Sequence, residues 1–105
     1  PGQRLRISAI SVWEVAMLEA KGRIALDLEC HVWVQRALAA PGFSLIPLRP
    51  EIAVASARLP GSFHGDPADR ILIATARQDG CTLVTADDAI LRYAHRGHLC
   101  VCSAA

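Results

Sequence analysis

The chain has 105 residues, of which 52% are hydrophobic and 20% charged, and its formal net charge is +1. This length and composition fit one packed core, so we expect residues 1–105 to form a single domain. No apolar run reaches about 18 residues, and no basic segment precedes a hydrophobic one at the start. We therefore expect neither a membrane span nor a signal peptide. A charge of +1 is too small to indicate nucleic-acid binding by itself.

The first half of the chain predicts strand, helix, helix and strand, over residues 4–9, 11–21, 27–40 and 43–47. A capping-box pattern from Ser11 to Glu14 predicts the start of the first helix, and Gly22 predicts its end. Asp27 is predicted to cap the second helix, and Pro41 ends it. The 4–9 segment alternates and contains Leu5 and Ile7, which suits a short strand.

The second half predicts helix, loop, helix, strand, helix and strand, over residues 50–58, 59–65, 67–79, 81–85, 88–95 and 99–102. Asp66 is predicted to cap the longest of these helices, Pro67 to take its first position and Gly80 to close it. Strands that alternate with one or two helices favour a mostly parallel sheet covered on both faces. We therefore predict an α/β fold with three layers, α/β/α.

The cysteines show no CxxC spacing; they are Cys30, Cys81, Cys100 and Cys102. Thiols in such a pattern are typical of reduced, buried core residues rather than of a disulfide framework or a zinc site. We therefore expect four core thiols in a cytoplasmic protein.

Carboxylates gather at one edge of the predicted sheet. Strands in such a sheet run the same way, and a helix that follows a strand begins at the carboxyl edge. Glu14 lies one turn into the helix after the first strand, Asp66 and Asp69 lie in the first turn of the 67–79 helix, and Asp87 follows the 81–85 strand. Open α/β sheets place their ligands at this edge. The pattern predicts a divalent-cation site there.

The position of Asp69 strengthens this prediction. On a helix, residue 69 shares a face with three apolar residues, Leu72, Ile73 and Ala76. A carboxylate that points along a buried stripe costs several kcal/mol unless a cation or an Arg compensates it, and Arg70 projects from a different part of the helix. The competing explanation is local: Glu14, Asp66, Asp69 and Asp87 each suit helix capping or the helix dipole, at about 1 kcal/mol or less. Capping does not account for an inward-facing Asp69.

The chain resembles the PIN-domain nucleases, and among them the VapC-like toxin ribonucleases of bacterial toxin–antitoxin pairs. Four segments in the expected order carry the likeness: SAISVWE at 8–14, KGR at 21–23, DPADRILIATA at 66–76 and LVTAD at 83–87. The resemblance implies an endoribonuclease that depends on Mg²⁺ or Mn²⁺, with RNA as substrate and an antitoxin protein as partner. Apolar helix surfaces suggest a homodimer and partner docking. Trp13 and Trp33 are candidates for partner contact or for the core.

The resemblance also assigns the site. Glu14, Asp69 and Asp87 would be the catalytic, metal-binding acids, with Asp66 as a supporting acid or cap. Thr85 would support Asp87 by hydrogen bonding. Arg side chains, with Arg70 and Arg23 as candidates, would hold flanking phosphates, although Arg70 also suits pairing with a local acid. Carboxylate oxygens are hard ligands of the kind that Mg²⁺ prefers.

One family feature has no counterpart in this sequence. The family opens with a central strand whose end carries a further site Asp, whereas the first Asp here is Asp27, on the wrong side of the motif order. We therefore expect a PIN-like sheet that lacks its opening strand, which leaves two parallel strand pairs, with the missing strand supplied by a further segment, another chain or a swapped element. If the strand is absent from the molecule, we expect weak metal binding and little activity. The alternative function is a catalytically incomplete module that binds RNA or protein. A receiver-like or phosphatase domain would need a nucleophilic Asp on an early strand.

Overall fold

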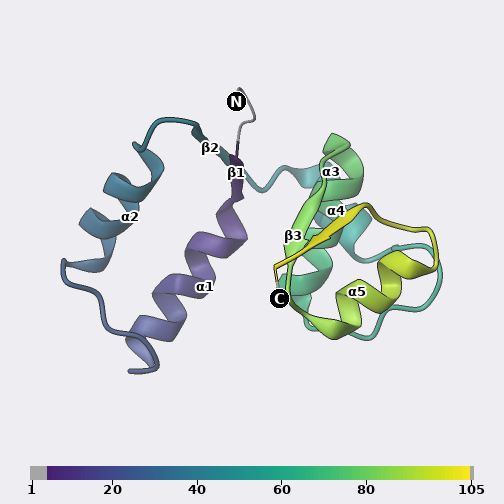
Figure 1. Cartoon of the computed structure of the whole chain (residues 1–105), viewed down its shortest axis with the longest axis horizontal. Helices are drawn as coiled ribbons and strands as arrows, with labels where there is room; N and C mark the ends of the chain where they lie inside the picture. Colours follow the sequence, from purple (N-terminus) through teal and green to yellow (C-terminus); the bar gives the residue numbers. More distant parts are fainter. Residues whose placement is uncertain (1–4, 105) are drawn as a thin grey trace. The chain divides into compact units, whose positions relative to one another are not determined.

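The computed structural model describes residues 5–104 and divides the chain into two compact units, Pro1–Leu48 (unit 1) and Arg49–Ala105 (unit 2). Each unit contains one two-stranded parallel sheet and the helices that connect or cover its strands (Figure 1). Among the described residues, the strands therefore form two parallel pairs, as the sequence predicts. Whether the chain behaves as one domain stays a prediction.

Unit 1 is a strand–helix–helix–strand segment. Strand β1 (Leu5–Ser8) pairs with β2 (Phe43–Ile46), and helices α1 (Ala9–Ala20) and α2 (Cys30–Leu38) connect them. The pairing is parallel, so the two helices must return the chain from the end of β1 to the start of β2. The predicted start of the first strand, Arg4, lies outside the described residues.

Both predicted helix caps in unit 1 are wrong. Helix α1 begins at Ala9, and the hydroxyl of Ser8 accepts a hydrogen bond from the Ile10 backbone N–H over 3.1 Å. The strand passes directly into the helix, so the capping-box pattern at Ser11 falls inside a helix that has already started. Helix α2 begins at Cys30, and its cap is Glu29 rather than Asp27; a carboxylate oxygen of Glu29 accepts from the His31 N–H over 2.7 Å.

Unit 2 follows the predicted order closely. Its elements are α3 (Pro50–Ser56), α4 (Pro67–Asp79), β3 (Leu83–Thr85), α5 (Asp88–His95) and β4 (Val101–Ser103). Strands β3 and β4 pair in parallel, α4 packs against α3 and β3, and α5 packs against β4 (Figure 1). Gly80 closes α4 in the left-handed conformation, at φ 64°, which a residue with a side chain adopts only at a cost.

The core of unit 2 lies under α4 and α5. Phe63, Ile73, Ile90 and Tyr93 form one buried cluster, and the Tyr93 ring is fully buried. The Tyr93 hydroxyl donates to the Pro60 carbonyl over 2.6 Å, and its ring meets that of Phe63 edge-on at 5.3 Å. These contacts tie the loop at residues 59–65 to α5, which matters because that loop leads directly into the Asp66 cap.

The cysteine prediction is partly wrong. None of the four cysteines forms a disulfide, but only Cys30 and Cys81 are even half-buried, and Cys100 and Cys102 are exposed. The last two lie in or next to β4, which has a neighbour on one side only. They are therefore not core residues. Within residues 5–104, no helix is long and apolar enough to cross a membrane.

Candidate active site

The N-terminus of α4 carries two of the predicted site acids. Asp66 caps the helix: its Oδ1 accepts a hydrogen bond from the Asp69 backbone N–H over 2.8 Å. Asp69 therefore lies in the first turn, where the helix dipole favours a negative charge. Asp66 is exposed and Asp69 is half-buried. The cap uses one oxygen of the Asp66 carboxylate, and a carboxylate has a second oxygen that can accept or bind a cation.

The inward-facing position predicted for Asp69 agrees with the burial of α4. Ile73 and Ala76 on the same face are buried, with 0% and 5% of their surface exposed, and Leu72 is half-buried. Asp69 thus heads the face of α4 that packs into unit 2, as its helical spacing predicts.

Asp87 sits between the end of β3 and the start of α5. Its Oδ1 accepts from the Ile90 N–H over 3.0 Å, which makes Asp87 the N-cap of α5. The Asp87 backbone N–H donates to the Thr85 hydroxyl oxygen over 3.1 Å. Thr85 is therefore hydrogen-bonded to the backbone of Asp87, and its supporting role in a catalytic site stays a prediction. As with Asp66, the cap occupies one carboxylate oxygen.

Arg70 has a structural task in this unit. Its Nε donates to the Ser56 carbonyl over 2.8 Å, and one terminal nitrogen donates to the Phe63 carbonyl over 2.6 Å. These bonds join the end of α3 and the 59–65 loop to the first turn of α4. The guanidinium thus satisfies backbone carbonyls. A phosphate-binding role for Arg70 stays a prediction. Neither of these two bonds pairs Arg70 with an acid.

Glu14 belongs to unit 1, where it is half-buried in the second turn of α1. In unit 2, by contrast, the structure brings Asp66 and Asp69 together in one helical turn and places Asp87 at a second helix N-terminus. Among residues 5–104, no group of three or more His, Cys, Asp or Glu side chains is close enough to hold a metal ion. The donor chemistry of the predicted set still fits a hard divalent cation, because every member offers carboxylate oxygens. The three-acid site stays a prediction.

Comparison with known proteins assigns the family. The model of the PIN domain matches residues 2–96. This chain belongs to the PIN-domain family. The ribonuclease VapC22 of Mycobacterium tuberculosis is similar as well: the two are 37% identical over 91 residues, which make up 87% of this chain and 68% of VapC22. The α/β order of elements and the two parallel strand pairs agree with a PIN-like fold.

Sequence reasoning missed a concave surface in unit 2 of this PIN domain. Its walls are the 59–65 loop and one face of α5, which present Arg92, Arg96 and His64. Arg92 and Arg96 lie one helical turn apart in the sequence, and this spacing was the signal that could have pointed to the surface.

Proposed function

We propose that this protein is a metal-dependent endoribonuclease of the VapC type, the toxin of a toxin–antitoxin pair, which acts on RNA in the cytoplasm. The observation that carries the proposal is the pair Asp69 and Asp87 at two helix N-termini of one unit in a PIN domain. The 37% identity to a protein named as a ribonuclease supports it independently.

The proposed site uses Glu14, Asp69 and Asp87 as ligands of Mg²⁺ or Mn²⁺. A bound divalent ion supplies an activated water molecule and neutralises negative charge on the scissile phosphate. Asp66 holds the first turn of α4 so that Asp69 stays at its head, and Thr85 holds the backbone of Asp87. Both supporting groups act through hydrogen bonds to the backbone, which fix the positions of Asp69 and Asp87.

The decisive experiment separates capping from metal binding. Asn is as good an N-cap as Asp, so Asp87→Asn preserves the acceptor for the Ile90 N–H and removes only the negative charge. We expect cleavage of single-stranded RNA in Mg²⁺ or Mn²⁺ to fall about 100-fold in Asp69→Asn and Asp87→Asn. Asp27→Asn, at an exposed carboxylate outside the proposed site, is the matched control and should cleave like the wild type.

Two results would contradict the proposal. Cleavage that survives in both Asp69→Asn and Asp87→Asn would remove the assigned site. RNA binding by the wild type without cleavage at any Mg²⁺ or Mn²⁺ concentration would favour the non-catalytic interaction module. Circular dichroism of each variant shows whether the fold is intact, so that a loss of activity is not confused with unfolding.

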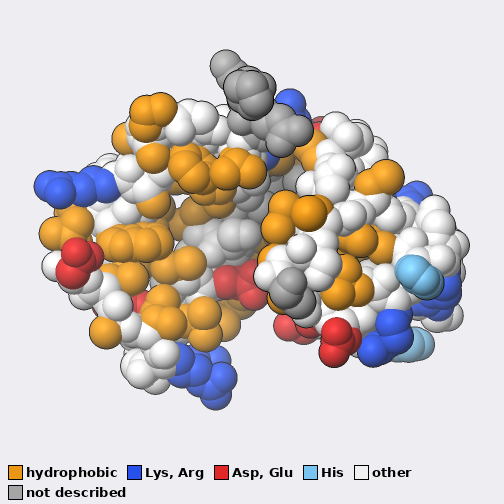
Figure 2. Space-filling view, in the orientation of Figure 1, with side chains coloured by type: hydrophobic (Ala, Val, Ile, Leu, Met, Phe, Trp, Pro, Cys, Tyr) orange, Lys and Arg blue, Asp and Glu red, His pale blue; other side chains and the backbone are white. Residues whose placement is uncertain are grey.

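A homodimer and an antitoxin complete the proposal. Unit 1 exposes large apolar side chains on both helices: Trp13 is 49% exposed, Leu18 36% and Val32 38%. Figure 2 shows hydrophobic side chains gathered over α1 and α2. Trp33 is half-buried and so suits the core better than Trp13 does. Light scattering of the wild type and of Trp13→Ser tests the homodimer, which should dissociate at higher protein concentration in the variant.

A further inference from the structure

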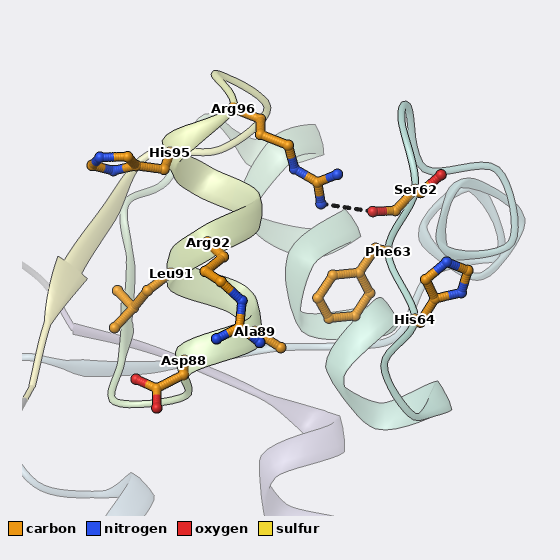
Figure 3. A pocket seen from close by; sticks show the side chains of 9 residues that line it. All are labelled: Ser62, Phe63, His64, Asp88, Ala89, Leu91, Arg92, His95 and Arg96. Atoms are coloured by element: carbon orange, nitrogen blue, oxygen red, sulfur yellow. Dashed lines mark hydrogen bonds between the residues drawn. The ribbon is translucent and has the colours of Figure 1, made fainter.

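A groove in unit 2 runs between the 59–65 loop and one face of α5 (Figure 3). Its volume, about 850 Å³, is within the range of ligand-binding clefts. Phe63 and Ala89 give it an apolar wall, while Asp88, Arg92 and Arg96 line its α5 side. The groove is therefore amphipathic, with an apolar surface beside two guanidinium groups.

The charged side chains of the groove share one face of α5. They are spaced four residues apart, at Asp88, Arg92 and Arg96, so each lies about one helical turn beyond the one before it. At about 1.5 Å per residue, α5 is about 12 Å long, so the groove has an acidic end and a basic end. The acidic end adjoins Asp87, one of the proposed catalytic acids, and the basic end lies one to two turns away from it.

Arg96 is already held in place at the basic end. One of its terminal nitrogens donates to the Ser62 carbonyl over 2.7 Å (Figure 3), and its guanidinium carbon lies 5.3 Å from the centre of the Tyr93 ring. These contacts fix the plane of the guanidinium and use one of its five N–H donors on Ser62. The remaining donors are pre-oriented, which lowers the entropy cost of binding an anion.

Arg92 differs from most other arginines of unit 2. Arg49, Arg70 and Arg77 each donate to groups of the protein, so their guanidiniums serve the fold. Arg92 is exposed and, within the described part of the chain, makes no hydrogen bond or ion pair, not even with Asp88 one turn before it. A cation that lines a groove and serves no structural contact has all five donors available for a ligand.

We propose that this groove binds the phosphate backbone of single-stranded RNA beside the cleavage position, with Arg92 and Arg96 on a flanking phosphate. The inference rests on the proposed ribonuclease function, which it deepens by assigning a substrate-binding surface. A planar guanidinium makes paired hydrogen bonds to phosphate oxygens. Asp88 repels phosphate, so the flanking phosphate lies at the basic end.

The test compares two arginines of the same unit. Arg58 is exposed, makes no side-chain hydrogen bond or ion pair within the described residues and does not line the groove, so Arg58→Gln is the matched control for Arg92→Gln. Both changes remove one charge and keep a good helix-forming residue. The affinity of the whole chain for a short fluorescent single-stranded RNA is measured by anisotropy in EDTA, which prevents cleavage, over a range of NaCl concentrations.

We expect Arg92→Gln to weaken RNA binding about fivefold and to reduce the slope of log K against log salt by about 0.7, because one phosphate contact is lost. Arg58→Gln should stay within about twofold of the wild type, with its slope unchanged. Arg92→Lys keeps the positive charge but lacks the planar guanidinium, so its affinity for RNA should lie between those of the wild type and Arg92→Gln. Equal effects of Arg92→Gln and Arg58→Gln would overturn the inference, and so would a wild type that does not bind RNA.

The outcomes separate this inference from the proposed function. If the wild type cleaves RNA and Arg92→Gln binds and cleaves as well as Arg58→Gln does, the groove is not a substrate surface and the ribonuclease stands. If the wild type binds RNA through Arg92 but does not cleave it in Mg²⁺ or Mn²⁺, the groove stands and the ribonuclease fails.

Discussion

The two units of this PIN domain differ in how far they bury their own apolar residues. In unit 2, helix α4 alone buries five residues, and Tyr93, Ile52 and Ile73 are fully inaccessible. In unit 1, by contrast, α1 and α2 bury none of their residues. Among the described residues of unit 1, the one buried apolar residue is Ile46. Because hydrophobic burial is the dominant favourable term in folding, unit 2 holds most of the stabilising core. The proposed catalytic acids are distributed over both units.

Aromatic substitutions should give the largest contrast between the units. Tyr93→Ala removes a fully buried ring and its bond to the Pro60 carbonyl, so we expect a loss of about 3–5 kcal/mol in the free energy of unfolding. Trp13→Ala removes a ring that is 49% exposed and should cost about 1 kcal/mol or less. Urea unfolding followed by circular dichroism measures both. Equal losses would show that unit 1 buries Trp13 as deeply as unit 2 buries Tyr93.

Helix caps should give a smaller, local contrast. Ser8→Ala removes the cap of α1 and Asp66→Ala the cap of α4, and each should cost about 1 kcal/mol. Amide hydrogen exchange shows where the loss falls. If the units open separately, Ser8→Ala should speed exchange in unit 1 and Asp66→Ala in unit 2. Faster exchange across both units from either change would instead confirm the single domain that the chain length predicts.

The smallest expected effect is electrostatic and belongs to unit 2. Arg49 bonds Glu51 over 2.8 Å and Asp79 over 2.7 Å, so it links the start of α3 to the end of α4. The pKa of the Glu51 carboxyl is lowered by a hydrogen bond from the Glu51 backbone N–H and by the hydrogen bond from Arg49. Because the folded pKa lies below the unfolded value of about 4.3, this stabilisation is present above that pH. It is lost as the pH falls through the folded pKa.

An NMR titration checks this contact. The pKa of Glu51 should lie below its ordinary value in the wild type and rise towards it in Arg49→Gln, although the backbone bond remains. An unchanged pKa in Arg49→Gln would show that the ion pair does not form in solution. Since Glu51 is exposed, solvent screening keeps the effect on stability small.

The sequence predicted unit 2 better than unit 1, and the reason is local. Asp66, Pro67 and Gly80 are strong end signals, so the bounds of α4 are those predicted, and α5 was also predicted with its observed bounds. In unit 1 the end signals are weaker. Ser8 ends a strand and caps a helix at once, and Glu29 is an unusual cap that pattern reasoning passes over.

The candidate site could be predicted only in part, for a related reason. Caps and helical spacing act within a few residues, so the positions of Asp66, Asp69 and Asp87 on their elements follow from sequence. Whether Glu14 joins them depends on packing between distant segments, which no local pattern encodes. The groove was missed because its two walls, the 59–65 loop and α5, are separated by more than twenty residues.

The affinity of the protein for Mn²⁺ tests whether Glu14, Asp69 and Asp87 each contribute a metal ligand, as proposed. Titration calorimetry compares the wild type with Glu14→Gln, Asp69→Asn and Asp87→Asn, and with the control Asp27→Asn. Since each acid would contribute a ligand, we expect each of the first three to weaken Mn²⁺ binding about tenfold or more, and the control to bind like the wild type. Mn²⁺ binding by Glu14→Gln that equals the control would contradict the account.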